Sequence, residues 1–250
     1  TQAFTFIATV EAIIDLGAKP IITEIDETLN MCAKDLKKKI TKKTKAIIPV
    51  HMLGVSVEVD EIKKIAKEKK IIVIDDNCEA LGAKWKNKPL GSQFDACTWS
   101  FDNGKTITTG EGGMITTNNF NLYKLSLEYR DHGHENNPKF PRGRDTHRIY
   151  GFNFRTTELN AVIGLEQLKK LKTLVKQNKR NYKVFFELLN KYDFVKFRKI
   201  PKHCEPLYDC LIFNLETKNK TLKFLNLMKK NNLITKNVPD AIEWHFVIYW

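Results

Sequence analysis

The sequence predicts an α/β protein with a mostly parallel central sheet and flanking helices, followed by part of a smaller α+β domain. Short apolar runs at 46–50 and 71–75 have the length of strands. Between them, residues 59–69 repeat apolar side chains every three or four positions, which is typical of a helix with one buried face. The run at 71–75 is apolar until its last residue, so we expect this strand to be covered on both sides.

The neighbouring segments extend the same alternation of strands and helices. A short helix is predicted at 35–40 and a small hairpin at 83–90. Further strands are predicted at 20–25 and 96–101, and the segments 106–109 and 114–117 flank a Gly-rich turn.

The second half of the chain is more helical. Residues 120–130 have a helical pattern. The polar stretch 132–150 predicts a long loop, and such a loop in a compact domain is usually functional or mobile. Thr157 is placed to cap a long helix whose Leu and Ile residues have the spacing of a core and interface surface. We expect one domain over residues 1–182 and the start of a second, smaller one over 183–250.

Charge and cysteine content exclude several classes of function. The 42 Lys and Arg against 29 Asp and Glu give a net charge of +13, but the lysines are scattered in short runs on the water-facing sides of helices. No basic stripe is interleaved with aromatic residues, so we expect no nucleic-acid partner. No apolar run approaches the ~20 residues of a membrane span, so we expect no membrane partner. Five cysteines without a C-x-x-C pair favour reduced thiols in a cytoplasmic protein.

One group of residues has the types that catalysis needs. Asp75 and Asp76 end a buried strand, Ser100 lies on the next core strand, and Lys105 follows it. Open α/β sheets bind ligands at the carboxyl ends of their strands. An acid and a lysine converging there suit pyridoxal phosphate, which needs a partner for its ring nitrogen and a Schiff-base lysine. Taken alone, these common residue types fit an ordinary surface as well.

The sequence around these residues resembles that of a known family. Segments 75–92, 99–117 and 151–168, with the opening run 4–26, are similar to the DegT/DnrJ-type sugar aminotransferases, which are fold type I pyridoxal-phosphate enzymes. The resemblance implies a cofactor-binding large domain that lacks its first segment, with its phosphate donors and ring-stacking aromatic residue. It also implies that the small domain lacks its end. We therefore expect weak or no turnover from residues 1–250 alone.

The resemblance also implies roles for single residues. Lys105 resembles the Schiff-base lysine, which moves a proton between substrate and cofactor and needs a neutral amine to do so. Asp76 resembles the carboxylate that keeps the pyridine nitrogen protonated, and strand alternation should turn Asp75 the other way. Ser100 resembles a phosphate-binding hydroxyl. Asn153 resembles the residue that reaches a phosphate across a dimer interface, so a homodimer with shared active sites is expected.

Other candidates are less certain from the sequence. Glu79 departs from the Gln or His of many relatives near the phenolic oxygen of the cofactor, where an acid must be protonated or paired. Arg142 and Arg144 could bind an anionic substrate as fork donors, although a solvated loop explains them nearly as well. His132 and His134 have no third ligand in register, so we expect no metal.

The function implied is transfer of an amino group from an amino acid, L-glutamate being the expected donor, to a keto-sugar. The sugar would be nucleotide-linked or an eight-carbon keto-sugar acid, used for polysaccharide or lipopolysaccharide biosynthesis. A sugar dehydratase of the same family, using pyridoxamine phosphate, is the first alternative; those enzymes replace the lysine by His, so Lys105 favours transamination. A non-catalytic binding or regulatory protein is the second alternative.

Overall fold

A central sheet of four strands organises the computed structural model of the chain, which describes residues 1–141, 143–233, 235, 245–247 and 250. The strands lie in the order β1 (Ala46–Ile47), β2 (Ile72–Asp76), β5 (Ala96–Ser100) and β6 (Gly113–Thr116). The first three are parallel, and β6 runs antiparallel to β5. The predicted α/β class with a mostly parallel sheet is confirmed.

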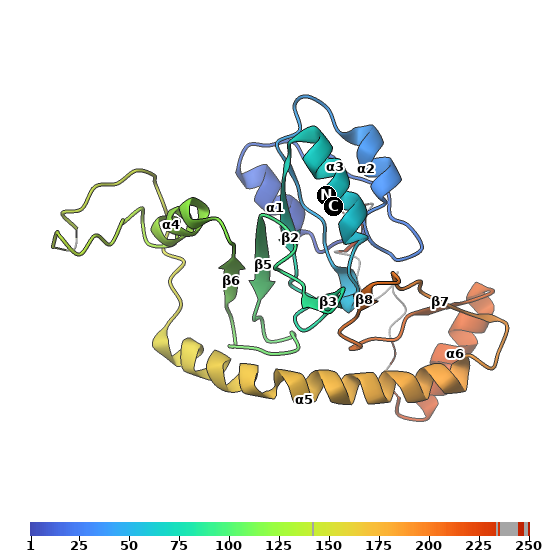
Figure 1. Cartoon of the computed structure of the whole chain (residues 1–250). Coiled ribbons are helices and arrows are strands. Elements are labelled where there is room, and N and C mark those ends of the chain that lie inside the picture. Colours follow the sequence, from blue (N-terminus) through green and yellow to red (C-terminus); the bar gives the residue numbers. More distant parts are fainter. Residues whose placement is uncertain (142, 234, 236–244, 248–249) are drawn as a thin grey trace.

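The helix α3 (Val59–Lys69) forms the crossover between the parallel strands β1 and β2. Its apolar residues face the core, and Ile62 is fully buried there. The helix ends at Lys70, which adopts a left-handed conformation (φ 54°) and turns the chain into β2. Figure 1 shows α3 beside α2 (Ala33–Lys39) and next to the sheet.

A small second sheet lies next to the main one. The hairpin of β3 (Lys84–Trp85) and β4 (Lys88–Pro89) gains a third strand from β8 (Cys204–Glu205), more than a hundred residues later in the chain. The Trp85 side chain is only 2% exposed and packs in the main core. Its ring nitrogen donates a hydrogen bond to Asp60 Oδ1 at 3.3 Å, which ties the hairpin to α3.

The long helix α5 (Glu158–Leu189) begins where the sequence predicts, with the Thr157 hydroxyl accepting a hydrogen bond from the Asn160 N–H at 3.2 Å. It runs along one side of the molecule (Figure 1). None of its residues is buried and Leu159 is 78% exposed, although Val175 packs against the main core. The expected domain division after residue 182 falls inside α5 and stays a prediction.

The remaining helices and strands surround these elements. They are α1 (Ala8–Asp15), the 3-10 helix η1 (Met52–Gly54), α4 (Phe120–Tyr129), β7 (Val195–Phe197), β9 (Phe213–Leu215) and α6 (Lys218–Lys230). No helix in the described part of the chain is long and apolar enough to cross a membrane.

One predicted strand is wrong. The segment 20–25 makes only single bridges, Thr23 with Gln2 and Ile25 with Met31, because the chain turns back before a ladder can extend. The segment 106–109, which leads into the Gly-rich turn, forms no strand. There the Thr108 hydroxyl and the Thr109 N–H both bond to the Phe101 carbonyl, so local hydrogen bonds replace the ladder.

Segments near the two ends of the chain lie together. Phe4 and Phe246 form an antiparallel bridge, and their rings stack with centroids 4.9 Å apart. The Thr5 N–H donates a hydrogen bond to the His245 carbonyl at 3.0 Å. This pairing places His245 beside the carboxyl edge of the central sheet, where it meets Glu79.

We expect replacement of Ile62 by Ala to lower the free energy of unfolding by about 2–5 kcal/mol, because it leaves a cavity in a packed core. Ile72→Ala is the matched control, since that side chain is 53% exposed, and it should cost less than about 1 kcal/mol. Denaturant unfolding at constant pH measures both values. Equal losses in the two variants would contradict the packing described for α3.

Candidate active site

Asp76 lies at the carboxyl end of β2, with both side-chain oxygens held in place. The Thr9 hydroxyl donates to Oδ2 at 2.9 Å and the Cys78 N–H donates to Oδ1 at 3.0 Å. A carboxylate has about four lone-pair positions, so each oxygen can accept a further hydrogen bond. The group is therefore a fixed acceptor at the edge where parallel sheets bind ligands.

Asp75 points into the opposite, fully buried face, as strand alternation predicts. Its Oδ2 accepts a hydrogen bond from the Asn77 amide at 2.6 Å and lies 3.3 Å from His51 Nε2. The Val57 N–H donates to His51 Nδ1, so the ring proton is on Nε2 and points to Asp75. His51 and Asp75 are both fully buried and belong to the core.

Glu79 is a paired carboxylate. The Leu53 N–H donates to its Oε2 at 2.8 Å, and His245 Nε2 lies 3.8 Å from its Oε1. Burial is the largest single influence and raises the pKa of Glu79, but His245, the Leu53 N–H and the charge of Lys105 together outweigh it. The net pKa lies below its usual value of 4.5, so Glu79 carries its negative charge at neutral pH.

Lys105 is half-buried in the turn after β5, where its N–H bonds to the Asp102 carbonyl at 3.1 Å. Its charge lowers the pKa of Glu79 and opposes the rise in the pKa of Cys78, two residues that follow Asp76 in the chain. Burial, and then the negative charge of Asp76, raise the pKa of Cys78 above its usual value. This thiol therefore stays protonated and is not a nucleophile.

Ser100 ends β5 at the same edge of the sheet. It lies two residues beyond Thr98, the register partner of Asp76 on the neighbouring strand. Its hydroxyl oxygen accepts a weak hydrogen bond from the Asp102 N–H at 3.4 Å. The structure thus places Asp76 and Ser100 at the ends of neighbouring strands and Lys105 in the turn after β5.

The loop residues lie apart from this group within one chain. The segment between α4 and α5 extends away from the sheet (Figure 1). In it, Asn153 is exposed and bridges to Asp131, and Arg144 is exposed as well. Arg142 lies outside the described residues.

Two partners at the site were not apparent from the sequence. Thr9 reaches Asp76 from 67 residues away, and His245 reaches Glu79 from near the other end of the chain. No local motif or spacing encodes contacts over such distances. The only available signal was the carboxylates themselves, since a buried acid requires donors.

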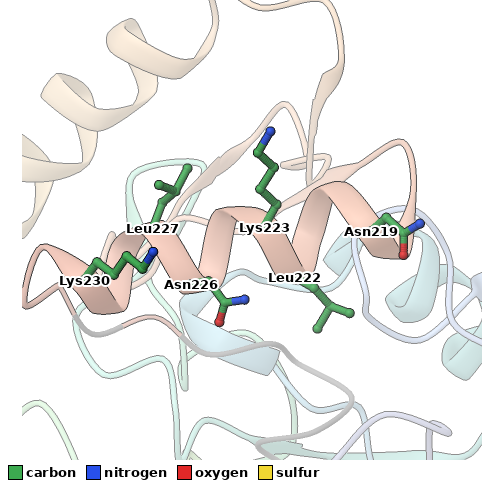
Figure 2. A pocket seen from close by; sticks show the side chains of 6 residues that line it. All are labelled: Asn219, Leu222, Lys223, Asn226, Leu227 and Lys230. Atoms are coloured by element: carbon green, nitrogen blue, oxygen red, sulfur yellow. The ribbon is translucent and has the colours of Figure 1, made fainter.

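A hollow elsewhere on the molecule is not a second candidate for the active site. Its lining consists of Asn219, Leu222, Lys223, Asn226, Leu227 and Lys230. All six come from α6, and Figure 2 shows their side chains pointing to different sides of the helix. No group of polar side chains converges there, so we assign it no chemistry.

The donor set at the sheet edge fits pyridoxal phosphate. Asp76 could supply an anchored carboxylate for a protonated ring nitrogen, Lys105 an amine for a carbonyl carbon, and Ser100 a hydroxyl for a phosphate oxygen. A neutral amide at position 76 would offer no charge to hold a ring proton. The residue types and their common edge are those that such a cofactor requires.

Comparison with known proteins agrees with this chemistry. The sequence model of the DegT/DnrJ/EryC1/StrS aminotransferase family matches residues 1–242. GDP-perosamine synthase of Escherichia coli O157:H7 is 38% identical over 187 residues, covering 74% of this chain and 50% of that protein. GDP-4-keto-6-deoxy-D-mannose 3-dehydratase of Yersinia pseudotuberculosis is 34% identical, covering 73% of this chain and 50% of its own length.

The solved structure of Helicobacter pylori PseC, an aminotransferase involved in the biosynthesis of pseudoaminic acid, has a TM-score of 0.83 and 28% sequence identity. The match covers 92% of this chain and 62% of PseC. The chain thus spans about half the length of the two curated relatives and less than two thirds of this structure.

We expect Glu79→Gln to destabilise the protein at pH 7, where the carboxylate keeps its pairing. A group whose folded pKa is depressed contributes stability above its unfolded pKa, here near 4.5, and loses it as the pH falls through the folded value. The difference between wild type and variant should therefore shrink between about pH 5 and pH 3.

Denaturant unfolding at a series of pH values measures this difference. Glu68→Gln, on the exposed side of α3, is the control and should show no such change. A Glu79→Gln difference that stays constant over the range would contradict the pairing.

Proposed function

Because the chain belongs to the DegT/DnrJ/EryC1/StrS aminotransferase family, we propose that it is part of a pyridoxal-phosphate-dependent aminotransferase that acts on a keto-sugar. The observation that carries this proposal is the Asp76 carboxylate at the strand edge, whose two oxygens are already held by Thr9 and Cys78, with Lys105 in the turn after the neighbouring strand β5. A lysine and an anchored carboxylate at one strand edge are the two groups that this cofactor needs.

When bound, pyridoxal phosphate supplies an electron sink for the negative charge that develops on the substrate carbon. Asp76 would accept the hydrogen bond of the ring N–H and keep that proton in place. The donors on Asp76 fix its orientation beforehand, so little reorganisation is needed. Ser100 would donate its hydroxyl to a phosphate oxygen.

Lys105 would hold the cofactor through Nζ and, once displaced by the amino donor, carry a proton to and from the reacting carbon. The charge of this lysine contributes to the lowered pKa of Glu79, and the Leu53 N–H fixes the Glu79 carboxylate. It would attract the protonated amine and so hold Lys105 near the reacting atoms.

The substrate we propose is a nucleotide-linked keto-sugar, with L-glutamate as the amino donor. GDP-perosamine synthase, a relative at 38% identity, is named for a nucleotide-linked sugar product. The product would enter polysaccharide biosynthesis. An eight-carbon keto-sugar acid is the other acceptor considered, since the exposed Arg144 could bind its carboxylate.

A dehydratase reaction is the second candidate, because the Yersinia relative is a dehydratase. Lys105 argues against it, since the dehydratases that the sequence resembles have His at this place. Transamination needs a lysine that both holds the cofactor and moves the proton.

A second copy of this chain is the partner we propose, with active sites shared between subunits. The helix α5 buries none of its residues, and Leu159 and Leu165 are 78% and 61% exposed. Beside it, Phe152 and Phe154 flank Asn153 and are also exposed. Monomeric proteins rarely expose apolar surface on this scale, so a partner covering it would also bring Asn153 to the neighbouring cofactor.

The cytoplasm is the compartment we propose for the reaction. All five cysteines are free thiols, and Cys97 is buried. Free thiols persist where glutathione and thioredoxin keep the surroundings reducing.

We expect borohydride reduction of the cofactor-loaded gene product to leave a phosphopyridoxyl group on Lys105. Prior addition of L-glutamate should remove this label, because the amino donor displaces the lysine. Peptide mass spectrometry locates the modified residue. Lys105→Ala should lose the label and Lys88→Ala, on the exposed strand β4, should keep it. A folded protein without label, or a label elsewhere, would contradict the assignment.

The shared site predicts complementation between two inactive variants. Lys105→Ala and Asn153→Ala homodimers should each have little activity, but a mixture that exchanges subunits forms heterodimers with one intact site. Random pairing should then restore about a quarter of wild-type activity. Amino-group transfer to the keto-sugar, assayed before and after mixing, measures this. No recovery despite demonstrated subunit exchange would show that Asn153 acts within its own chain or not at all.

A further inference from the structure

Three side chains with metal-ligating atoms meet in the loop between α4 and α5. His134, Asp145 and His147 each offer one such atom, and these atoms all lie within 4.8 Å of one another. His134 Nδ1 is 3.3 Å from Asp145 Oδ1 and 3.1 Å from His147 Nε2. Among the described residues, these are the His, Cys, Asp and Glu side chains that lie close enough to one another to hold a metal ion.

The spacing of these atoms matches tetrahedral coordination. Zinc binds imidazole nitrogen and carboxylate oxygen at about 2.0–2.1 Å, so two ligand atoms of a tetrahedron lie about 3.3–3.4 Å apart. The two distances from His134 Nδ1 are within about 0.3 Å of this value. A small inward or outward shift of the side chains would therefore complete the geometry.

Hydrogen bonding alone leaves this cluster poorly satisfied. His134 Nδ1 faces both Asp145 and His147, but a ring nitrogen either donates one proton or accepts. If it donates to Asp145, it can serve His147 only by sharing that proton. If it accepts from His147, its lone pair faces the carboxylate oxygen. A cation at the centre satisfies all three atoms at once.

The surroundings of the cluster hold it in this arrangement. The Asn136 N–H donates to the second oxygen of Asp145 at 2.9 Å, which leaves Oδ1 facing the histidines. The Asp145 side chain is only 4% exposed. Gly133, with φ 84°, lets the two arms of the loop approach closely, since a Cβ there would lie 2.1 Å from the Ile149 carbonyl oxygen.

We propose that His134, Asp145 and His147 bind one divalent transition-metal ion of the zinc class, with a water at the fourth position. The ligand set of two imidazoles and one carboxylate suits this class of ion. The ion would join the two arms of the loop, because His134 comes from one arm and Asp145 and His147 from the other. Its role is structural: it fixes the loop that carries Asn153.

This inference replaces the expectation of no metal, which considered His132 and His134. The side chains that complete the set lie 11 and 13 residues after His134, too far for a local ligand motif to show. The proposal does not depend on the cofactor or on the reaction, since the three ligands lie apart from Asp76 and Lys105.

The test is metal binding by the purified gene product after treatment with a chelator. Titration with Zn²⁺ alone, followed by calorimetry, should show one ion per chain. Co²⁺ in its place should give the visible absorption of a tetrahedral site. His147→Gln and Asp145→Asn should each weaken Zn²⁺ binding by at least about 100-fold, because loss of a ligand costs at least as much as loss of a supporting contact.

His132→Asn is the matched control and should bind Zn²⁺ like wild type, since this loop histidine stands outside the cluster and Asn tolerates its positive φ of 56°. Zn²⁺ should also slow proteolytic cleavage between residues 131 and 153 in wild type and not in Asp145→Asn. Failure of the wild type to take up one ion would overturn the proposal. So would equal binding by all three variants, which would place the ion elsewhere.

Discussion

The alternation of Asp75 and Asp76 on β2 is the constraint on which the rest of the site depends. One carboxylate enters the core with His51 and Asn77, and the other reaches the open edge with Thr9. A shift of β2 by one residue would exchange the two faces. The register with β1 and β5 therefore determines which acid can meet a ligand, and the buried core of α3 holds that register.

Burial gives each acid at this edge a defined set of partners. An unpaired carboxylate away from water is costly, so the chain surrounds each one with donors. Backbone N–H groups of Cys78 and Leu53 serve Asp76 and Glu79. These donors belong to the chain itself, so they are in place without a bound ligand. The acids are thus oriented in advance, which is what electrostatic stabilisation of a reacting group requires.

The sequence predicted the parallel sheet, the hairpin and the capped start of α5, because each depends on local pattern or on a single capping residue. It also predicted that Asp75 and Asp76 point in opposite directions, since strand alternation is a local property. It did not predict the contacts of Thr9 and His245, which join segments far apart in the chain. The spacing of apolar residues predicted an apolar face on α5. Whether a core or a second subunit covers that face depends on tertiary structure.

Asp76, and not Asp75, is the residue we propose to hold the proton on the ring nitrogen of the cofactor. Nitrogen-15 NMR of the gene product loaded with ring-labelled pyridoxal phosphate tests it most directly, because the chemical shift reports whether that nitrogen is protonated. The ring nitrogen should be protonated in wild type, remain so in a folded Asp75→Asn variant, and lose its proton in Asp76→Asn. A ring nitrogen that stays protonated in Asp76→Asn would contradict this role for Asp76.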